Sequence, residues 1–220
     1  MIFSWFKNKK NTHYPDFWIE YLNGFKIKNK LNLQETRFIS FDTETTGFDT
    51  SNDRILSIGA VSILNKKVAV SDTFETYIKQ SVFKKDTVKI HGLLKKGTLH
   101  QIEELAALKL FLAYIKNDIL VAHHIGFDYK MINEALLRNG LGKLKNQKLD
   151  TGILYKKSKH IIYRDNLKNY SLDDLCEELK IQKIDRHTAI GDALITAIAF
   201  QKIVGRLNKK NMMKLKKLFY

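Results

Sequence analysis

The chain has 220 residues, enough for one globular domain with short extensions, and its 44% hydrophobic content excludes a disordered or fibrous protein. Its 38 Lys and Arg against 23 Asp and Glu give a formal net charge of +15, compatible with nucleic-acid binding but equally with a lysine-rich surface that binds none. The single cysteine, Cys176, excludes an internal disulfide. No apolar run approaches the roughly 18 residues of a membrane span. In the opening MIFSWFKNKK the apolar residues precede the lysines, unlike an export signal, so we expect a cytoplasmic protein.

The first part of the chain predicts strands. Residues 1–36 read as an N-terminal extension with a short amphipathic helix at 15–25. Apolar-rich strands are expected at 37–42, 55–64 and 72–78. Thr98 followed by Gln101 is a capping-box pattern, which predicts that a helix begins there and continues to about residue 116.

The second part alternates between helices and strands. A short strand at 118–123 precedes a helix at 127–140 that Gly140 ends, and 148–151 reads as another short strand. Ser171 with Asp174 repeats the capping pattern before a helix, and a long apolar helix is expected at 188–207. Residues 206–220 form a basic tail or extend that helix. Strands first, then alternating helices and strands, predict an α/β fold with a mixed sheet flanked by helices.

Asp42 and Glu44, in the segment FDTETTGFD at 41–49, are the first candidate functional residues. They stand two apart on a predicted strand, so their side chains share one face, with Cα atoms about 6.6 Å apart. Two neighbouring carboxylates repel one another unless a cation lies between them. Because Gly47 predicts a turn, the pair stands near the strand end, either as a ligand site or as ordinary solvated acids.

Asp192 is the acid that is hardest to explain without a ligand or a partner. It lies in a predicted helix of small and apolar residues, where a carboxylate is rarely buried alone. His187 precedes it by five residues, about 140° around a helix, so the two serve one site if His187 lies on the loop before Thr188 caps the helix. Asp128 begins another predicted helix, where the helix dipole favours an acid with or without a function.

The segments FDTETTG, HxxGFD and HxxxxD together resemble the DEDDh exonuclease superfamily, above all the proofreading epsilon subunit of bacterial DNA polymerase III and its stand-alone relatives. The likeness covers residues 37–205 and implies a ribonuclease H-like fold, with a five-stranded mixed sheet flanked by helices. It implies that four acids bind metal and that His187 is the general base. These acids are Asp42, Glu44, Asp128 and Asp192. Candidate substrate contacts are His91 in the segment IHGL (90–93), Asp86 and Thr45.

This residue set predicts a metal-dependent hydrolysis. Four carboxylates without a nearby cysteine favour Mg²⁺ or Mn²⁺ over zinc and can hold two such ions. With His187 taking a proton from water, the expected reaction releases a nucleoside 5′-monophosphate from the 3′ end of a nucleic acid. The expected substrate is a single-stranded or frayed 3′ end of DNA, in replication or repair. Phe48 or Phe127 could stack on terminal bases, although such aromatics more often belong to the core.

Two alternatives remain open at this stage. RNA trimming is the first, because the ribonuclease T and oligoribonuclease groups resemble the same motifs, although TETTG rather than LEMTG favours the polymerase-associated branch. A non-catalytic module that binds nucleic acid or a polymerase is the second, and the complete set of five residues argues against it. Little chain follows Gly205 to serve as the polymerase-binding segment of the epsilon subunit, so association with a polymerase also stays open.

Overall fold

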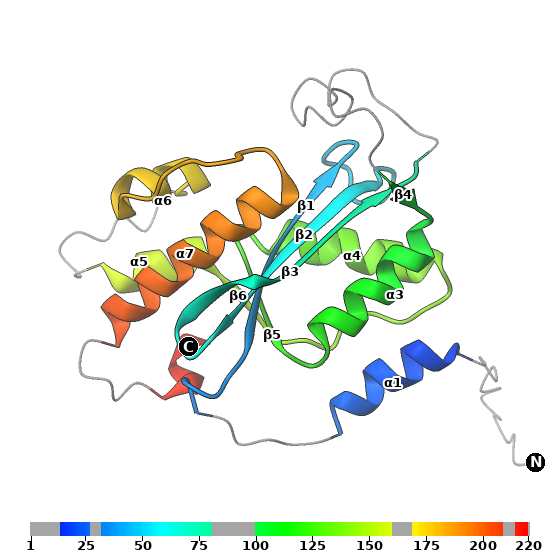
Figure 1. The fold of residues 1–220 in the computed structure, drawn as a ribbon, viewed down its shortest axis with the longest axis horizontal. Helices are drawn as coiled ribbons and strands as arrows, with labels where there is room; N and C mark the ends of the chain where they lie inside the picture. The colour runs from blue at the N-terminus through cyan, green and yellow to red at the C-terminus, as the bar shows by residue number, and fades with distance from the viewer. Residues whose placement is uncertain (1–13, 27–31, 81–99, 160–168, 209–213, 220) are drawn as a thin grey trace, which may run out of the picture.

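The computed structural model describes residues 14–26, 32–80, 100–159, 169–208 and 214–219 (Figure 1). Within these ranges six strands form one mixed sheet in the order β4-β3-β2-β1-β5-β6. An antiparallel meander is formed by β1 (Phe38–Thr45), β2 (Ile55–Leu64) and β3 (Lys67–Ile78). Strands β5 (Ile119–Ala122) and β6 (Lys148–Asp150) continue the sheet parallel to β1. The mixed sheet is therefore confirmed, with one strand more than expected, because the two-residue β4 (Gln101–Ile102) pairs parallel with β3.

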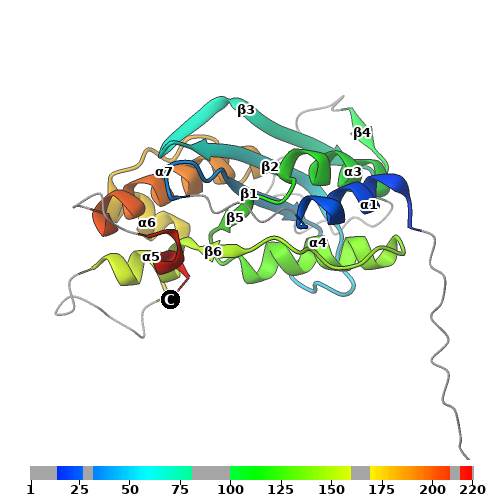
Figure 2. The same ribbon diagram turned by 90° about the horizontal axis from the view of Figure 1, so that it is seen from below.

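Helices cover both faces of this sheet (Figures 1 and 2). One apolar cluster joins the sheet to α1 (Asp16–Gly24), α3 (Glu104–Ile115) and α4 (Gly126–Arg138). A second joins the opposite face to α5 (Thr151–Ser158), α6 (Leu172–Leu179) and α7 (Ala189–Leu207). Central strand β1 serves both layers, since Ile39 and Phe41 belong to the first cluster and Phe38 to the second. Alternating side chains of one strand thus face two different helical layers.

Helix starts follow the capping predictions in two of three places. Ser171 and Asp174 form a reciprocal capping box at the start of α6, and Thr188 caps α7 by accepting from the N–H of Gly191. The predicted start near Gln101 is wrong: Gln101 lies in β4, and α3 begins at Glu104 without a side-chain cap. The other half of that pattern, Thr98, lies outside the described residues.

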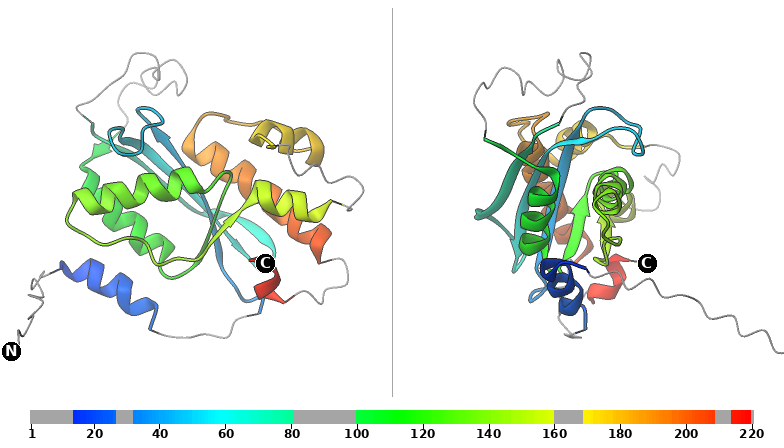
Figure 3. Two further views of the ribbon diagram at one scale, coloured as in Figure 1. Left: turned by 180° about the vertical axis from the view of Figure 1, so that it is seen from behind. Right: turned by 90° about the vertical axis from the view of Figure 1, so that its right-hand side faces the viewer.

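The first and the last of the described segments, 14–26 and 214–219, both contact the core. Trp18 of α1 is buried in the first cluster. Helix α1, dark blue in Figure 3, lies next to α3. Helix α7 ends at Leu207, and a 3₁₀ helix, η3 (Leu215–Leu218), buries Leu218 in the second cluster. Among the residues described, none of the helices is both long and apolar enough to cross a bilayer.

Candidate metal and active site

Strand β1 supplies the first two acids, Asp42 and Glu44, on the face that α7 covers. The hydroxyl of Ser40 donates to the backbone carbonyl of Ala193 in α7, at 2.8 Å. Because side chains alternate along a strand, Asp42 and Glu44 follow Ser40 toward the same helix. Asp42 is half-buried and Glu44 is buried. Both predicted acids therefore lie within the strand, and they face the first turn of α7.

Gly59 allows α7 to approach this closely. It lies in β2 directly opposite Asp42. A Cβ atom at this position would lie 2.2 Å from the backbone carbon of Ala189 and 2.2 Å from the nitrogen of Ile190. The start of α7 thus rests on the bare backbone of the sheet, beside Asp42. A glycine within a strand often marks a site where another segment of backbone approaches closely. This close approach brings the first turn of α7, which contains the third acid, next to β1 and β2.

That third acid, Asp192, lies in the first turn of α7 and is buried. One ligand atom each from Asp42, Glu44 and Asp192 lies within 4.8 Å of the others. Oδ2 of Asp192 accepts from Nη1 of Arg186, whereas Oδ1 is buried without a hydrogen-bond partner among the described residues. A buried oxygen in a cluster of carboxylates suits a hard divalent cation such as Mg²⁺ or Mn²⁺. The donor set thus fits the expected metal.

Asp128 approaches the same strand from the opposite layer. It occupies the first turn of α4, and its Oδ1 accepts from both the backbone N–H of Thr43 (3.0 Å) and the Thr43 hydroxyl (2.7 Å). Burial raises the pKa of Asp128 to about 7, although the two Thr43 hydrogen bonds oppose this rise. Thr43, which was not predicted as a site residue, therefore holds Asp128 against β1. Thr43 stands between Asp42 and Glu44 in that strand.

The four carboxylates act on one another electrostatically. Burial raises the pKa of Asp42 well above its usual range, and the charges of Asp128, Asp192 and Glu44 raise it further. Burial also raises the pKa of Asp192, while Arg186 opposes that shift. Acids that hold protons this tightly gain from a cation that neutralises them, so the cluster is an electrostatic site for positive charge.

His187 lies on the loop before α7, as predicted, and is exposed. Its backbone φ is 64°, and that of Asp185 is 52°, which places both in the left-handed region. Residues other than glycine adopt this conformation infrequently, and such positions concentrate at functional sites. Thr188 stabilises the loop, because its hydroxyl donates to the carbonyl of Asp185 at 2.7 Å. His187 therefore lies on a hydrogen-bonded loop directly before α7, and the residue is exposed to solvent.

The loop after β1 presents an aromatic side chain. Phe48 is 85% exposed, and its ring centroid lies 5.9 Å from that of Phe127, which directly precedes Asp128. Buried Asp53 shapes the loop by accepting from the Thr46 hydroxyl and from the N–H of Asp49. Thr45 is buried, and its hydroxyl donates to the carbonyl of Gly47 at 2.7 Å, so this candidate substrate contact is engaged within the turn.

The histidine of the HxxGFD segment has a scaffolding position. His123 lies 3.0 Å through Nδ1 from the Thr151 hydroxyl and 2.9 Å through Nε2 from the backbone carbonyl of Tyr170. Burial lowers its pKa to about 4, so the ring is neutral near pH 7 and Nε2 donates to that carbonyl. His123 thereby ties the end of β5 to α5 and to the start of α6.

Two candidate substrate contacts, His91 and Asp86, lie outside the described residues. Arg186 was not predicted as a site residue, although it contacts Asp192 from the position directly before His187. Its position beside a candidate base and near a buried acid was the available signal.

The site and the fold together define a ribonuclease H-like α/β domain with a cluster of carboxylates at one end of its central strand. The family named RNase T and described as exonuclease matches residues 39–200, and the chain belongs to this exonuclease family. The chain is 39% identical over 180 residues to DNA polymerase III PolC-type of Caldanaerobacter subterraneus subsp. tengcongensis, a match that covers 80% of the chain and 12% of that protein. It is 30% identical over 186 residues to a DNA polymerase III subunit epsilon-like protein of Rhodobacter capsulatus, over 82% of the chain and 25% of the relative.

Solved structures share the fold. Cell-death related nuclease 4 superposes with a TM-score of 0.67 at 14% identity, over 78% of this chain and 64% of that one. Escherichia coli Exonuclease I in complex with a dT13 oligonucleotide superposes with a TM-score of 0.66 at 16% identity, over 80% and 43% of the two chains. These structures confirm the fold, and the curated relatives confirm the relationship to DNA polymerase III PolC-type and epsilon-like proteins, although the chain spans only 12% of the PolC-type relative and 25% of the epsilon-like one.

Proposed function

We propose that the chain is a divalent-metal-dependent 3′-to-5′ exonuclease that acts on DNA and releases nucleoside 5′-monophosphates. The observation that carries this proposal is the convergence of Asp42, Glu44 and Asp192, whose ligand atoms lie within 4.8 Å of one another. Three elements distant in sequence, β1, α4 and α7, bring carboxylates to the same end of one strand. Because the chain belongs to an exonuclease family, we infer that the reaction at this cluster is the hydrolysis of a nucleic-acid strand.

Each residue has a role in this proposal. Bound at the carboxylates, two Mg²⁺ or Mn²⁺ ions supply Lewis-acid stabilisation of negative charge on the scissile phosphate. Asp42, Glu44 and Asp192 hold the cations, with Asp128 as the fourth acid. His187 accepts the proton of the attacking water at its imidazole, the side chain that enzymes use most often as a general base. Its exposed position leaves the ring accessible to a strand end.

DNA is the proposed substrate for three reasons. The relatives are named as DNA polymerase III proteins, and Escherichia coli Exonuclease I was solved with a dT13 oligonucleotide. The net charge of +15 attracts a polyanion. Phe48, exposed and packed on Phe127, which directly precedes Asp128, offers a surface on which a terminal base can stack. A polymerase is a candidate partner on the names of the relatives, and a cytoplasmic location, with which the free Cys176 is compatible, belongs to the same proposal.

The proposal is tested on oligonucleotides of one sequence, made as DNA and as RNA and labelled at the 5′ end. We expect stepwise shortening from the 3′ end with Mg²⁺ or Mn²⁺, faster on DNA, and none in EDTA. Asp192→Asn should abolish shortening, whereas Asp185→Asn, an exposed acid on the preceding loop, should not. Faster RNA shortening would favour the RNA-trimming alternative. Equal digestion in EDTA, or by the Asp192→Asn variant, would refute the proposed mechanism.

A further inference from the structure

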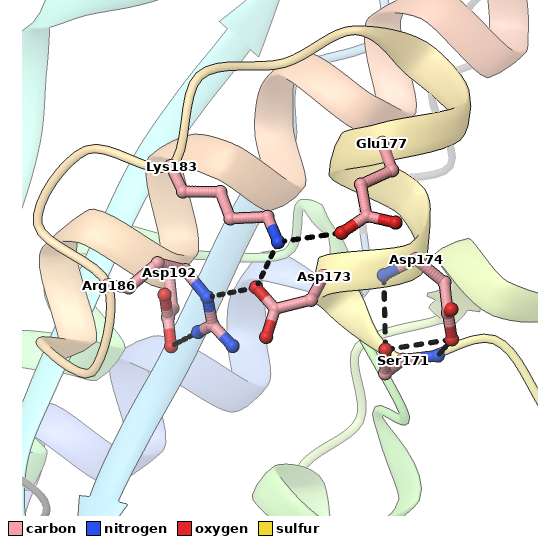
Figure 4. A network of polar contacts seen from close by, with 7 residues as sticks. All are labelled: Ser171, Asp173, Asp174, Glu177, Lys183, Arg186 and Asp192. Atoms are coloured by element: carbon pink, nitrogen blue, oxygen red, sulfur yellow. Dashed lines mark hydrogen bonds and ion pairs between the residues drawn. The ribbon is translucent and has the colours of Figure 1, made fainter.

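Arg186 contacts the carboxylate cluster from the loop that carries His187 (Figure 4). Its Nη1 donates to Oδ2 of Asp192, and its Nε donates to Oδ1 of Asp173 in α6, at 3.0 Å. The side chains of Arg186 and Asp192 are 17% and 9% exposed. An ion pair at this depth is screened much less by water and salt than one on the surface.

The ammonium group of Lys183 belongs to the same network of ion pairs, but its partners are on α6 and not in the carboxylate cluster. Nζ of Lys183 lies 3.5 Å from Asp173 and 3.1 Å from Glu177, both on α6. Its side chain is 40% exposed. Lys183 and Arg186 thus share a partner in Asp173, but only Arg186 extends from this shared carboxylate to Asp192 (Figure 4).

Arg186 and a divalent cation compete for the negative charge of Asp192. Ligand atoms of three carboxylates lie within 4.8 Å of one another, so their mutual repulsion favours any positive charge placed among them. The guanidinium supplies one such charge at Oδ2 of Asp192. It also repels a divalent cation that approaches the same carboxylate. One residue therefore stabilises the acid and weakens the attraction of the site for metal.

We propose that Arg186 is a positioning residue that acts as the built-in counter-cation of Asp192: it neutralises this carboxylate before a divalent cation binds, and it lowers the affinity of the site for that cation. The inference rests on the proposed function, because it takes Asp192 to be a metal ligand. An arginine with a merely structural role would not lower metal affinity.

The test compares Arg186→Met, Arg186→Lys and Lys183→Met by thermal unfolding in EDTA and by calorimetric titration with Mn²⁺. Arg186→Met removes the charge, so we expect the unfolding midpoint in EDTA to fall by about 5–10 °C. Its Mn²⁺ affinity should rise about three- to tenfold. Arg186→Lys keeps the charge, so its Mn²⁺ affinity should lie closer to that of the wild-type chain than the affinity of Arg186→Met does. Lys183 forms ion pairs with α6 alone among the described residues, so Lys183→Met should leave Mn²⁺ affinity unchanged.

A double-mutant cycle with Asp192→Asn identifies the partner of Arg186 in EDTA. We expect the midpoint loss from Arg186→Met to shrink by at least half when Asp192 is already Asn. An undiminished loss in that background, or lower or unchanged Mn²⁺ affinity of Arg186→Met, would overturn the inference. If the wild-type chain binds no Mn²⁺, the proposed function fails and the metal arm of the inference fails with it, while the cycle in EDTA still tests the counter-cation role separately.

Discussion

Gly59→Ala is the substitution that most directly tests how the fold builds the site. The added Cβ would meet the backbone of Ala189 and Ile190 at 2.2 Å, whereas non-bonded carbon atoms prefer about 3.5–4.0 Å. Because the obstacle is backbone, no side-chain rotation can relieve the clash. The first turn of α7 must therefore move away from β2 by more than about 1 Å. Asp192 lies in that turn and moves with it.

Two effects of different size should follow. Overpacking of this kind costs about 1–3 kcal/mol, which corresponds to roughly 3–10 °C in the unfolding midpoint of a domain this long. A displacement of about 1 Å in a catalytic group lowers the rate about 100-fold. We therefore expect Gly59→Ala to remain folded at 25 °C while kcat falls about 30- to 100-fold and Mn²⁺ binding weakens.

Gly205→Ala provides the matched control within the same helix. A Cβ at this position would meet nothing within 4 Å, and alanine is the better helix former, so stability should hold or rise slightly. Both variants are measured by thermal unfolding, Mn²⁺ titration and release of mononucleotides from a 3′ end. Wild-type activity in a folded Gly59→Ala variant would show that the close approach of α7 does not position Asp192.

Three further predictions concern the proposed base, an acid and the exposed aromatic. His187→Ala should lower kcat about 100- to 1,000-fold near pH 7 and leave Mn²⁺ affinity intact; full activity on a labelled oligonucleotide would refute the assigned base. The folded chain holds the proton of Asp128 up to a pKa of about 7, above the ordinary value of about 3.9, so Asp128 should contribute a fall of roughly 4 kcal/mol to the unfolding free energy in EDTA as pH rises between these values. Because the pKa values of Asp42 and Asp192 are raised as well, Asp128→Asn should reduce that slope in urea titrations without abolishing it, and a slope as steep as that of the wild-type chain would contradict the burial argument. Phe48→Ala should raise KM for single-stranded DNA about tenfold with little change in unfolding midpoint, because the ring is 85% exposed; an unchanged KM would exclude base stacking.

Local patterns predicted much of the fold and the positions of its acids. Strand β2 spans the residues that its apolar run indicated, and the capping residues Ser171 and Thr188 start the predicted helices. The loop position of His187 was predicted from the Thr188 cap and from helical geometry, since five residues turn a side chain away from Asp192 and the two serve one site only if His187 precedes the helix. These features depend on neighbours in sequence, which a single chain displays directly.

What the sequence could not predict depends on contacts between distant segments. Arg186 gives Asp192 the partner that burial demands, but its second anchor, Asp173, lies on another helix. Thr43 binds an acid 85 positions away, and its hydroxyl carries no periodic signal. The predicted helix start at Gln101 failed because a strand pairing with β3 took precedence over a local capping pattern.

Helix α1 shows that the exonuclease family match and the folding unit have different limits. The match begins at residue 39, yet Trp18 is 1% exposed and packs in the core cluster with α3. The Tyr21 hydroxyl donates to Oδ1 of Asn146 at 2.6 Å, and Asn146 in turn donates to the carbonyls of Lys116 and Asp118 on either side of the turn into β5. Transplanting residues 39–200 alone into another polypeptide would therefore uncover an apolar face. A stable domain transferred to another polypeptide must therefore include α1, or the recipient protein must provide another apolar surface that packs on α3.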